Sequence, residues 1–218
     1  VVFLMLFPLL AAFVLLIIPQ YTIRKWTVLV SAALLIAAAV YLLIEYSNLG
    51  MVYFDLEGHA IDQVMMVIEA FLAIYVVYLG MRHKQYFTAL LMVMQAAVIL
   101  YFEVTYSEGF QISHNLFLDQ FSIIMALIIG VIGSLICVYA VGYMKDYHHH
   151  HPEIKNRTPF FFFVMFVFLA AMFGVVFANN LLWLYFFWEI TTLCSFLLIG
   201  YTQSEEAVKN AFRALWMN

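Results

Sequence analysis

The sequence has few charged residues, and this scarcity excludes the ordinary classes of soluble globular protein. Only 10% of its 218 residues are charged, whereas 67% are hydrophobic, and the mean hydropathy is +1.01. A soluble chain of this length has too little polar surface to cover so many apolar side chains. The composition therefore predicts an all-α protein, a polytopic bundle of transmembrane helices.

The scarcity of cysteines and of basic residues argues against metal-binding and nucleic-acid-binding proteins. The two cysteines, Cys137 and Cys194, lie within apolar segments and lack the spacing of metal ligands, so we interpret them as small buried hydrophobic residues. The net charge is -4 and no basic stripe is present to neutralise phosphates, which argues against a nucleic-acid partner. No segment has the pattern of a flavin, haem, iron–sulfur or nucleotide site. We therefore expect no cofactor and no catalytic centre in this chain.

The apolar residues fall into eight segments, each of which predicts a helix. These segments are about 1–18, 27–46, 61–81, 86–106, 119–144, 160–178, 180–200 and 204–218. Asn179-Asn180 leaves only a very short turn between the sixth and seventh, so these two helices should be antiparallel neighbours. Because the chain starts at Val1 and its last helix stops before it would cross a membrane, we expect the N-terminal part of a longer polypeptide.

The few charges are distributed unevenly among the loops. The loops after the first, third and fifth segments hold basic residues, namely Arg24, Lys25, Arg82, Lys84, Lys145, Lys155 and Arg157. The loops after the second and fourth segments hold acidic residues but no lysine or arginine. By the positive-inside rule, this asymmetry predicts a multi-pass protein of the cell membrane with its N-terminus outside.

One stretch between the helices lacks helical periodicity. Apolar residues alternate from Phe110 to Leu116, which predicts a short hairpin or extended segment on the outer surface. This segment suggests three regions: a four-helix region at 1–106 that includes an additional helix pair at 61–106, the outer hairpin at 107–118, and a truncated C-terminal region at 119–218.

One acidic residue, Glu189, lies where a charge is costly. It is inside Leu181–Gly200, a run of 20 residues with no other charge, whose helical length matches a bilayer core of ~30 Å. A charge near the centre of such a helix costs on the order of 2.5–3.5 kcal/mol. A carboxylate tolerated there has a partner, a hydrated cavity or a proton to carry, so we predict a functional residue. The alternative is a neutral carboxylic acid that only hydrogen-bonds to a neighbouring helix.

Three motifs around Glu189 are specific: the Asn-Asn-Leu-Leu turn at 179–182, the Trp188-Glu189 pair and the Ser-Phe-Leu-Leu-Ile-Gly run at 195–200. Together with the stretch 118–144, they resemble the antiporter-like subunits of respiratory complex I, of multi-subunit cation/proton antiporters and of energy-converting membrane-bound hydrogenases. The resemblance is strong from Phe117 onward. It implies the start of an inverted-repeat, ion-translocating fold, in which the glutamate matching Glu189 transfers ions in concert with lysines on neighbouring helices.

The resemblance also assigns a role to the last segment, which is similar to the start of the next family helix. Arg213, rather than Lys209, falls where the family usually has a lysine. Arginine effectively never loses its proton, so Arg213 should be a fixed counter-charge for Glu189 and not a relay residue. At ~1.5 Å per helical residue, the two residues should differ in depth by roughly 6 Å. Lys209 lies one turn away on the same face, where it either joins in ion transfer or extends to the cytoplasmic surface.

The additional pair 61–106 departs from the family plan, which passes directly from the second helix to the outer hairpin. The pair brings Glu69 and Gln95 to matched depth on consecutive antiparallel helices. We predict that these side chains face one another as a neutral hydrogen-bonded pair that holds the two helices together. The alternative for Glu69 is an accessory proton branch or a contact with a partner.

Three smaller features complete the predictions. His148–His151 should form a solvated cytoplasmic loop, with proton collection at a channel mouth as the alternative. The aromatic residues Trp183, Tyr185 and Trp188 should form an interfacial belt. Asp119 should begin the fifth helix, where the helix dipole stabilises an acid.

Three functions remain open. The first is an ion-translocating subunit that couples ion pumping to redox chemistry in hydrogenase-like or quinone- or ferredoxin-linked partner subunits. The second is a subunit of a multi-subunit Na⁺/H⁺ antiporter without a redox partner, and the third is a passive membrane scaffold. The two translocating alternatives predict H⁺ or Na⁺ as the ion. All three predict other membrane subunits and the lipid bilayer as partners.

Overall fold

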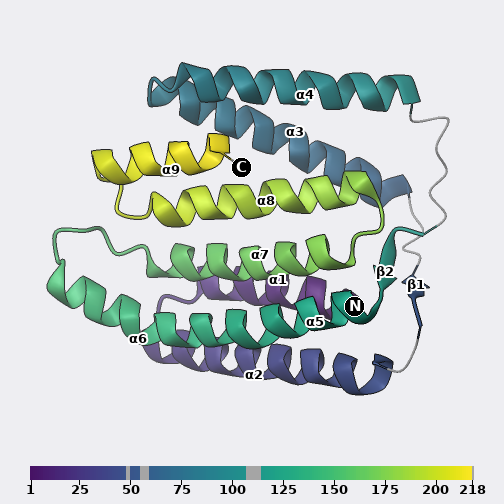
Figure 1. Ribbon diagram of the computed structural model, residues 1–218. Coiled ribbons are helices and arrows are strands. Elements are labelled where there is room, and N and C mark those ends of the chain that lie inside the picture. The colour runs from purple at the N-terminus through teal and green to yellow at the C-terminus, as the bar shows by residue number, and fades with distance from the viewer. Residues whose placement is uncertain (48–49, 55–58, 107–113, 218) are drawn as a thin grey trace.

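The computed structural model describes residues 1–47, 50–54, 59–106 and 114–217, which form helices and two short strands (Figure 1). The helical elements are α1 (Val2–Ile17), α2 (Tyr21–Tyr46), α3 (His59–Arg82), α4 (Tyr86–Tyr106), α5 (Gln120–Ile128), the π-helical turn η1 (Ile129–Gly133), α6 (Ser134–His150), α7 (Thr158–Phe177), α8 (Leu181–Ile199) and α9 (Glu205–Met217). The strands are β1 (Val52–Phe54) and β2 (Leu116–Leu118). All eight predicted segments are helical, because α5, η1 and α6 form one continuous helix, and the predicted all-α bundle is confirmed.

The chain is a multi-pass membrane protein. Within the described residues, five helices are long and apolar enough to cross a membrane, namely Tyr21–Tyr46, Gln63–Arg82, Gln120–His150, Thr158–Phe177 and Leu181–Ile199. Val2–Ile17 and Tyr86–Tyr101 are shorter apolar helices. At ~1.5 Å per residue, even the shortest of the five spans roughly the ~30 Å of a bilayer core.

Two predicted helix boundaries are wrong for the same physical reason. The second helix starts at Tyr21 and not near residue 27, so Arg24 lies within its first turns and is buried instead of lying in a loop. The fifth helix continues to His150 instead of ending at 144. In both places charged or polar residues were taken as a break, yet neither segment contains a true helix breaker. The second helix follows Pro19, and the fifth ends just before Pro152, which disfavours helical geometry in the residue before it.

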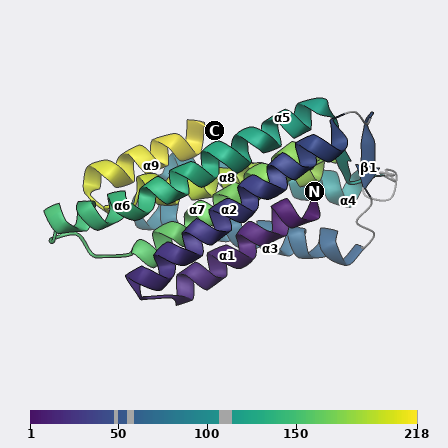
Figure 2. The same cartoon turned by 90° about the horizontal axis from the view of Figure 1, so that it is seen from below.

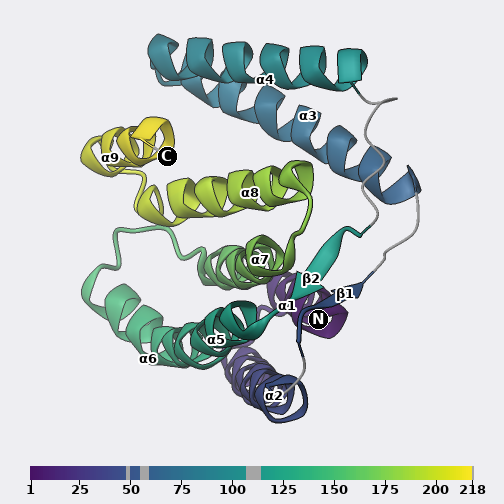
Figure 3. The ribbon, with the colours of Figure 1, turned by 45° about the vertical axis from the view of Figure 1, so that its right-hand side comes forward.

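The helices stack in layers, with α7 near the centre. Figures 1 and 3 show α2 on one side and the α3–α4 pair on the other, with α8 and α9 beneath that pair. Helix α7 packs against α1 and α8, while α2 packs along α5, η1 and α6. Four phenylalanines of α7 are almost completely buried: Phe162, Phe166, Phe173 and Phe177. Viewed from below, the bundle helices cross one another at shallow angles (Figure 2).

Two glycines of the central long helix permit close approach to its neighbours. They lie in the π-helical turn η1, where Gly130 faces α2 and Gly133 faces α7. A Cβ added at Gly130 would lie 2.6 Å from Cβ of Ala39, and one at Gly133 would lie 2.5 Å from a methyl carbon of Leu169. A larger residue at Gly130 would therefore push this helix away from α2, whereas one at Gly133 would displace the end of the Leu169 side chain. Such π turns commonly mark functional positions in helices.

A short two-stranded sheet lies beside the C-terminal end of α7. β1 pairs antiparallel with β2, with Val52 opposite Leu118 and Phe54 opposite Leu116, and Leu116 also bridges to Ala178. The alternating pattern correctly predicted extended backbone at 116–118, whereas residues 107–113 of the proposed hairpin lie outside the described residues. The partner strand β1 was not predicted. Because β1 and β2 are adjacent, the chain leaves the bundle and returns to it at nearly the same point.

Candidate functional site

Glu189 lies near the middle of α8. The helix begins at a side-chain cap, in which Asn180 Oδ1 accepts a hydrogen bond of 2.9 Å from the Leu182 N–H, and it ends at Gly200. Glu189 is therefore far from both ends of the helix. Its side chain is half-buried. The predicted central placement of this acid is thus borne out by the helix bounds.

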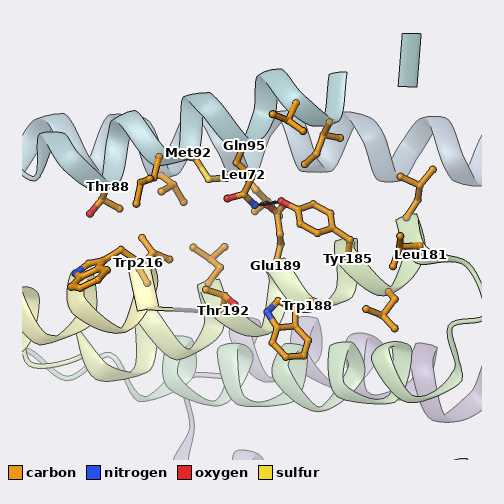
Figure 4. Close-up of a pocket in the computed structure, with 18 residues that line it drawn as sticks. Leu72, Thr88, Met92, Gln95, Leu181, Tyr185, Trp188, Glu189, Thr192 and Trp216 are labelled. Atoms are coloured by element: carbon orange, nitrogen blue, oxygen red, sulfur yellow. Dashed lines mark hydrogen bonds between the residues drawn. The ribbon is translucent and has the colours of Figure 1, made fainter. Parts of the chain in front are cut away.

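Glu189 accepts hydrogen bonds from two different helices. Gln95 of α4 donates from Nε2 to Glu189 Oε1 at 2.7 Å, and the Tyr185 hydroxyl, one turn earlier on α8, donates to the same oxygen. Gln95 Nε2 also contacts the Tyr185 hydroxyl. Figure 4 shows the three side chains converging between α4 and α8. Donors of this kind stabilise an ionised carboxylate in a site where water is scarce.

The cluster borders a cavity of about 690 Å³ between the α3–α4 pair and α8–α9. Its lining residues are Leu72, Val76, Thr88, Leu91, Met92, Gln95, Val98, Ile99, Leu181, Leu182, Leu184, Tyr185, Trp188, Glu189, Thr192, Leu193, Leu215 and Trp216. Most of these side chains are apolar, and among the described lining residues Glu189 is the one acidic group. Its second oxygen, Oε2, is buried and has no hydrogen-bond partner among the described residues.

The structure shows two hydrogen-bond partners of Gln95 that were not predicted. Its amide N–H group reaches Glu189 and Tyr185 on α8. Glu69 is half-buried on α3, and its carboxyl group lies within electrostatic range of the Tyr185 hydroxyl, so it belongs to the same neighbourhood. The proposed contact between Glu69 and Gln95 stays a prediction.

The two basic residues of α9 are not brought to Glu189. Ala211 and Phe212 form the buried face of α9 against α8, where Phe212 packs on Phe196, while Lys209 and Arg213 lie on the exposed face. Arg213 donates to Asn210 Oδ1 at 3.5 Å. The roles of Arg213 and Lys209 in ion transfer stay predictions. The residues of α9 that line the cavity are instead Leu215 and Trp216, and no pattern in the sequence predicted this.

The histidine run is helical up to His150, so the predicted loop is wrong for His148–His150. His148 is half-buried, and its Nε2 lies 2.8 Å from the hydroxyl of Tyr201, between α8 and α9. Arg157 also binds Tyr201, donating from its guanidinium to the Tyr201 carbonyl at 3.1 Å. Within the described ranges, no three His, Cys, Asp or Glu side chains are placed to hold a metal ion.

An exposed pair lies beyond the end of α6. His151 Nδ1 is 3.1 Å from the carboxylate of Glu153. The backbone N–H of Glu153 and, next, the His151 side chain hold the pKa of that carboxyl below its usual range. The pair is fully solvated, so it indicates a local turn and not a binding site.

The proposed aromatic belt is wrong at two of its three positions. Trp183 is 3% exposed and packs in the main core, and Tyr185 turns inward to Glu189, whereas Trp188 is 48% exposed. A helix places residues four apart on one face, so the spacing of Tyr185 and Glu189 is the signal that would have found this contact.

Two family matches cover much of the second half of the chain. The family described as "NADH-Ubiquinone oxidoreductase (complex I), chain 5 N-terminus" matches residues 104–153, and "NADH:quinone oxidoreductase/Mrp antiporter, TM" matches residues 178–218. The second match contains Tyr185, Glu189 and all of α9. These matches support the superfamily of complex I and Mrp antiporter-like membrane subunits for this chain. In this antiporter-like subunit, most of the α3–α4 pair precedes the first matched residue.

Curated relatives agree with this family. The "Na(+)/H(+) antiporter subunit A1" of Staphylococcus haemolyticus is 33% identical over 122 residues, which is 56% of this chain and 14% of the relative. The protein of the same name from Staphylococcus aureus is 35% identical over 98 residues, 45% of this chain and 11% of the relative. The antiporter-like subunit described here thus spans only a small part of the length of these relatives.

Proposed function

We propose that this chain is an ion-translocating subunit of a multi-subunit membrane complex, and that Glu189 takes up and releases the translocated ion. The single observation that carries the proposal is the placement of Glu189. Among the described residues it is the one acidic group in the lining of a 690 Å³ cavity, and donors from two helices hold it in place. Intramembrane carboxylates at such positions mark ion pathways and proton relays.

The proposed mechanism is electrostatic. A positive charge that approaches Glu189 favours its ionised form and therefore release of the ion, while withdrawal of that charge favours uptake. Lys209 and Arg213 are the basic residues of α9, a helix whose Leu215 and Trp216 border the same cavity. Because both basic side chains are exposed, their approach would require a rearrangement of α9 or of its surroundings. Glu69 remains proposed as an accessory group on the α3 side.

The source of energy has two candidates. In the first, redox chemistry in partner subunits drives pumping, as expected for relatives of complex I or of membrane-bound hydrogenases. The printed name of the curated relatives, an Na⁺/H⁺ antiporter subunit, supports the second, in which a cation gradient drives H⁺ exchange without a redox partner. The two candidates are separated by adding Na⁺ to everted vesicles that hold a proton gradient. Collapse of the gradient in the absence of any electron donor indicates antiport.

The orientation is part of the proposal. With the N-terminus outside the cell membrane, the turn between α3 and α4, which contains Arg82 and Lys84, lies in the cytoplasm. A cysteine placed in this turn should react only with reagent that reaches the cytoplasmic side. Labelling of intact cells by an impermeant reagent would overturn this orientation.

The substitution Glu189→Gln tests the function itself. A glutamine can still accept the hydrogen bonds of Gln95 and Tyr185, so the protein should assemble normally, but the titrating group is gone. We expect ion-dependent changes of the vesicle proton gradient, followed with a pH-sensitive dye, to fall at least tenfold. Glu153→Gln, the same change at an exposed carboxylate, is the matched control and should leave transport unchanged. Full transport by an assembled Glu189→Gln protein would leave only the scaffold function.

A further inference from the structure

Gln95 is a polar side chain in the mostly apolar lining of the cavity. Its amide N–H group contacts residues of α8 and not of its own helix pair, among the contacts that the structure describes. Its amide crosses from α4 to α8, and the hydrogen bonds that the structure gives it are those to Glu189 and Tyr185. Around it the α4 lining of the cavity consists mostly of Leu91, Met92, Val98 and Ile99. An apolar residue would fill this position equally well if packing of α4 against its neighbours were the only requirement.

The two oxygens of Glu189 have different surroundings. Oε1 accepts from both Gln95 and Tyr185, whereas Oε2 is buried without a partner among the described residues. A buried acceptor left unsatisfied is costly, typically by about 1–3 kcal/mol. This asymmetry leaves Oε2 as the atom that gains most from binding a proton, while Oε1 is held by fixed donors.

We propose that Gln95 is a positioning residue for ion exchange at Glu189: it anchors Oε1, so that uptake and release take place at Oε2. The proposal rests on the proposed function of Glu189 and extends it to the α3–α4 pair. In this arrangement Gln95 tunes the site without carrying the ion itself. Gln95 has no proton to exchange at physiological pH, because its amide does not titrate.

Other titratable and charged groups near the Glu189 carboxyl group can also affect its protonation. Glu69 lies on the α3 side, and Tyr185 lies on α8. From α9, Lys209 and Arg213 point to the exposed side. Helix α7, which packs beneath α8, contains no titratable residue. Gln95 and Tyr185 are therefore the donors whose removal should change the exchange at Glu189 most directly.

The substitution Gln95→Leu provides the test, carried out on the intact protein together with any subunits that accompany it in the membrane. Leucine keeps the bulk and removes the donor, so the ionised carboxylate loses a charge-assisted hydrogen bond. We expect the transport-versus-pH profile to move toward alkaline pH by about one unit, with assembly retained. Gln63→Leu is the matched control, because it is the same change at an exposed position of α3, and its profile should not move.

A purely structural role predicts different results. If Gln95 only holds α4 against α8, Gln95→Leu will lower the amount of assembled protein and leave its pH profile in place, which overturns the proposal. If Gln95→Leu does not accumulate, Gln95→Asn carries the same test, since it keeps the amide but withdraws it by one methylene group. Glu189→Gln separates the two claims. An inactive Glu189→Gln with an unshifted Gln95 variant refutes the positioning role alone, whereas an active Glu189→Gln refutes the proposed function as well.

Discussion

The helix bundle and the α3–α4 pair differ in how they are held. In α7, half of the most apolar 18-residue window is buried inside the protein, whereas in α3 the buried share is 17%. The bundle is fixed by interlocking phenylalanines and by glycines that let helices approach closely. The pair is fixed mainly by contacts between its own two helices and by contacts with α8 and α9 across a cavity.

This difference suggests a division of tasks. Helix α8, which packs on the well-buried α7, presents Glu189 near its middle, and the less buried α3–α4 pair supplies one of the two donors that surround its carboxyl group. Elements with few buried contacts open and shift at low cost in free energy. The pair is therefore the part of the structure in which small movements would change the surroundings of Glu189 without disturbing the fold.

The largest expected effect contrasts a phenylalanine from each region. Phe166 of α7 is fully buried, while Phe71 of α3 is 69% exposed. Phe166→Ala leaves a cavity in the bundle and should lower the free energy of unfolding by about 3 kcal/mol, whereas Phe71→Ala should change it by less than about 0.5 kcal/mol. Thermal unfolding in detergent measures both. Similar losses at the two positions would contradict the distinction between a tightly packed bundle and a loosely held pair.

A second contrast uses glycines. A Cβ added at Gly174 of α7 would lie 2.4 Å from ring carbons of Phe187, whereas nothing lies within 4 Å of one added at Gly142 of α6. Gly174→Ala should therefore force α7 and α8 apart and cost about 1–3 kcal/mol of unfolding free energy. The matched control Gly142→Ala should be neutral or stabilising, because alanine favours a helix.

A related substitution probes the pair. A Cβ at Gly80 of α3 would lie 3.1 Å from Cβ of Ala89. Gly80→Ala should lower the free energy of unfolding by less than Gly174→Ala does, because α3 can shift away from α4 with little loss of other packing. A loss at Gly80 as large as that at Gly174 would show that the pair is as rigid as the bundle.

The smallest expected effect concerns the start of α5, where the chain re-enters the bundle. Asp119 accepts a 2.7 Å hydrogen bond from the Ser122 N–H, and this bond holds the pKa of its carboxyl below the usual range. A lowered folded-state pKa stabilises the fold at pH values above the pKa of the unfolded chain, and this stabilisation is lost as the pH falls through the folded-state value. Asp119→Ala should therefore cost about 1 kcal/mol at neutral pH.

Thermal unfolding of both proteins over a range of acid pH measures this dependence. The difference in unfolding free energy between the wild-type protein and Asp119→Ala should become smaller as Asp119 becomes protonated. Asp119→Asn keeps an acceptor for the Ser122 N–H and should abolish the pH dependence while retaining most of the stability. A difference in unfolding free energy that stays constant at all pH values would indicate that the charge of Asp119 does not contribute to stability.

The sequence predicted what depends on local pattern. Long apolar runs define membrane helices whatever surrounds them, and the depth of Glu189 and Gln95 follows from counting residues along those runs. What depth does not provide is the direction in which a side chain points. Gln95 was predicted to face Glu69 because the two helices are consecutive, and its contact with α8 was not foreseen. That contact depends on how α4 packs over the bundle, which no local pattern encodes.

Other differences have equally specific causes. The strand β1 was missed because it has three residues and its partner lies in a distant part of the chain. The histidine run was taken as a loop because it is polar, although a helix persists until proline interrupts it. Tyr185 was assigned to a membrane interface from its residue type, whereas its position four residues before Glu189 determines its role.

The pairing of β1 with β2 also has a consequence for the order of events during synthesis. Roughly 60 residues separate the two strands, so at a translation rate of about 5–20 residues per second β1 waits some 3–12 s for its partner. In that interval α1 and α2 lack their partners in the bundle, because α5, α6 and α7 have not yet been made. The α3–α4 hairpin must therefore enter the bilayer before the region around it is complete.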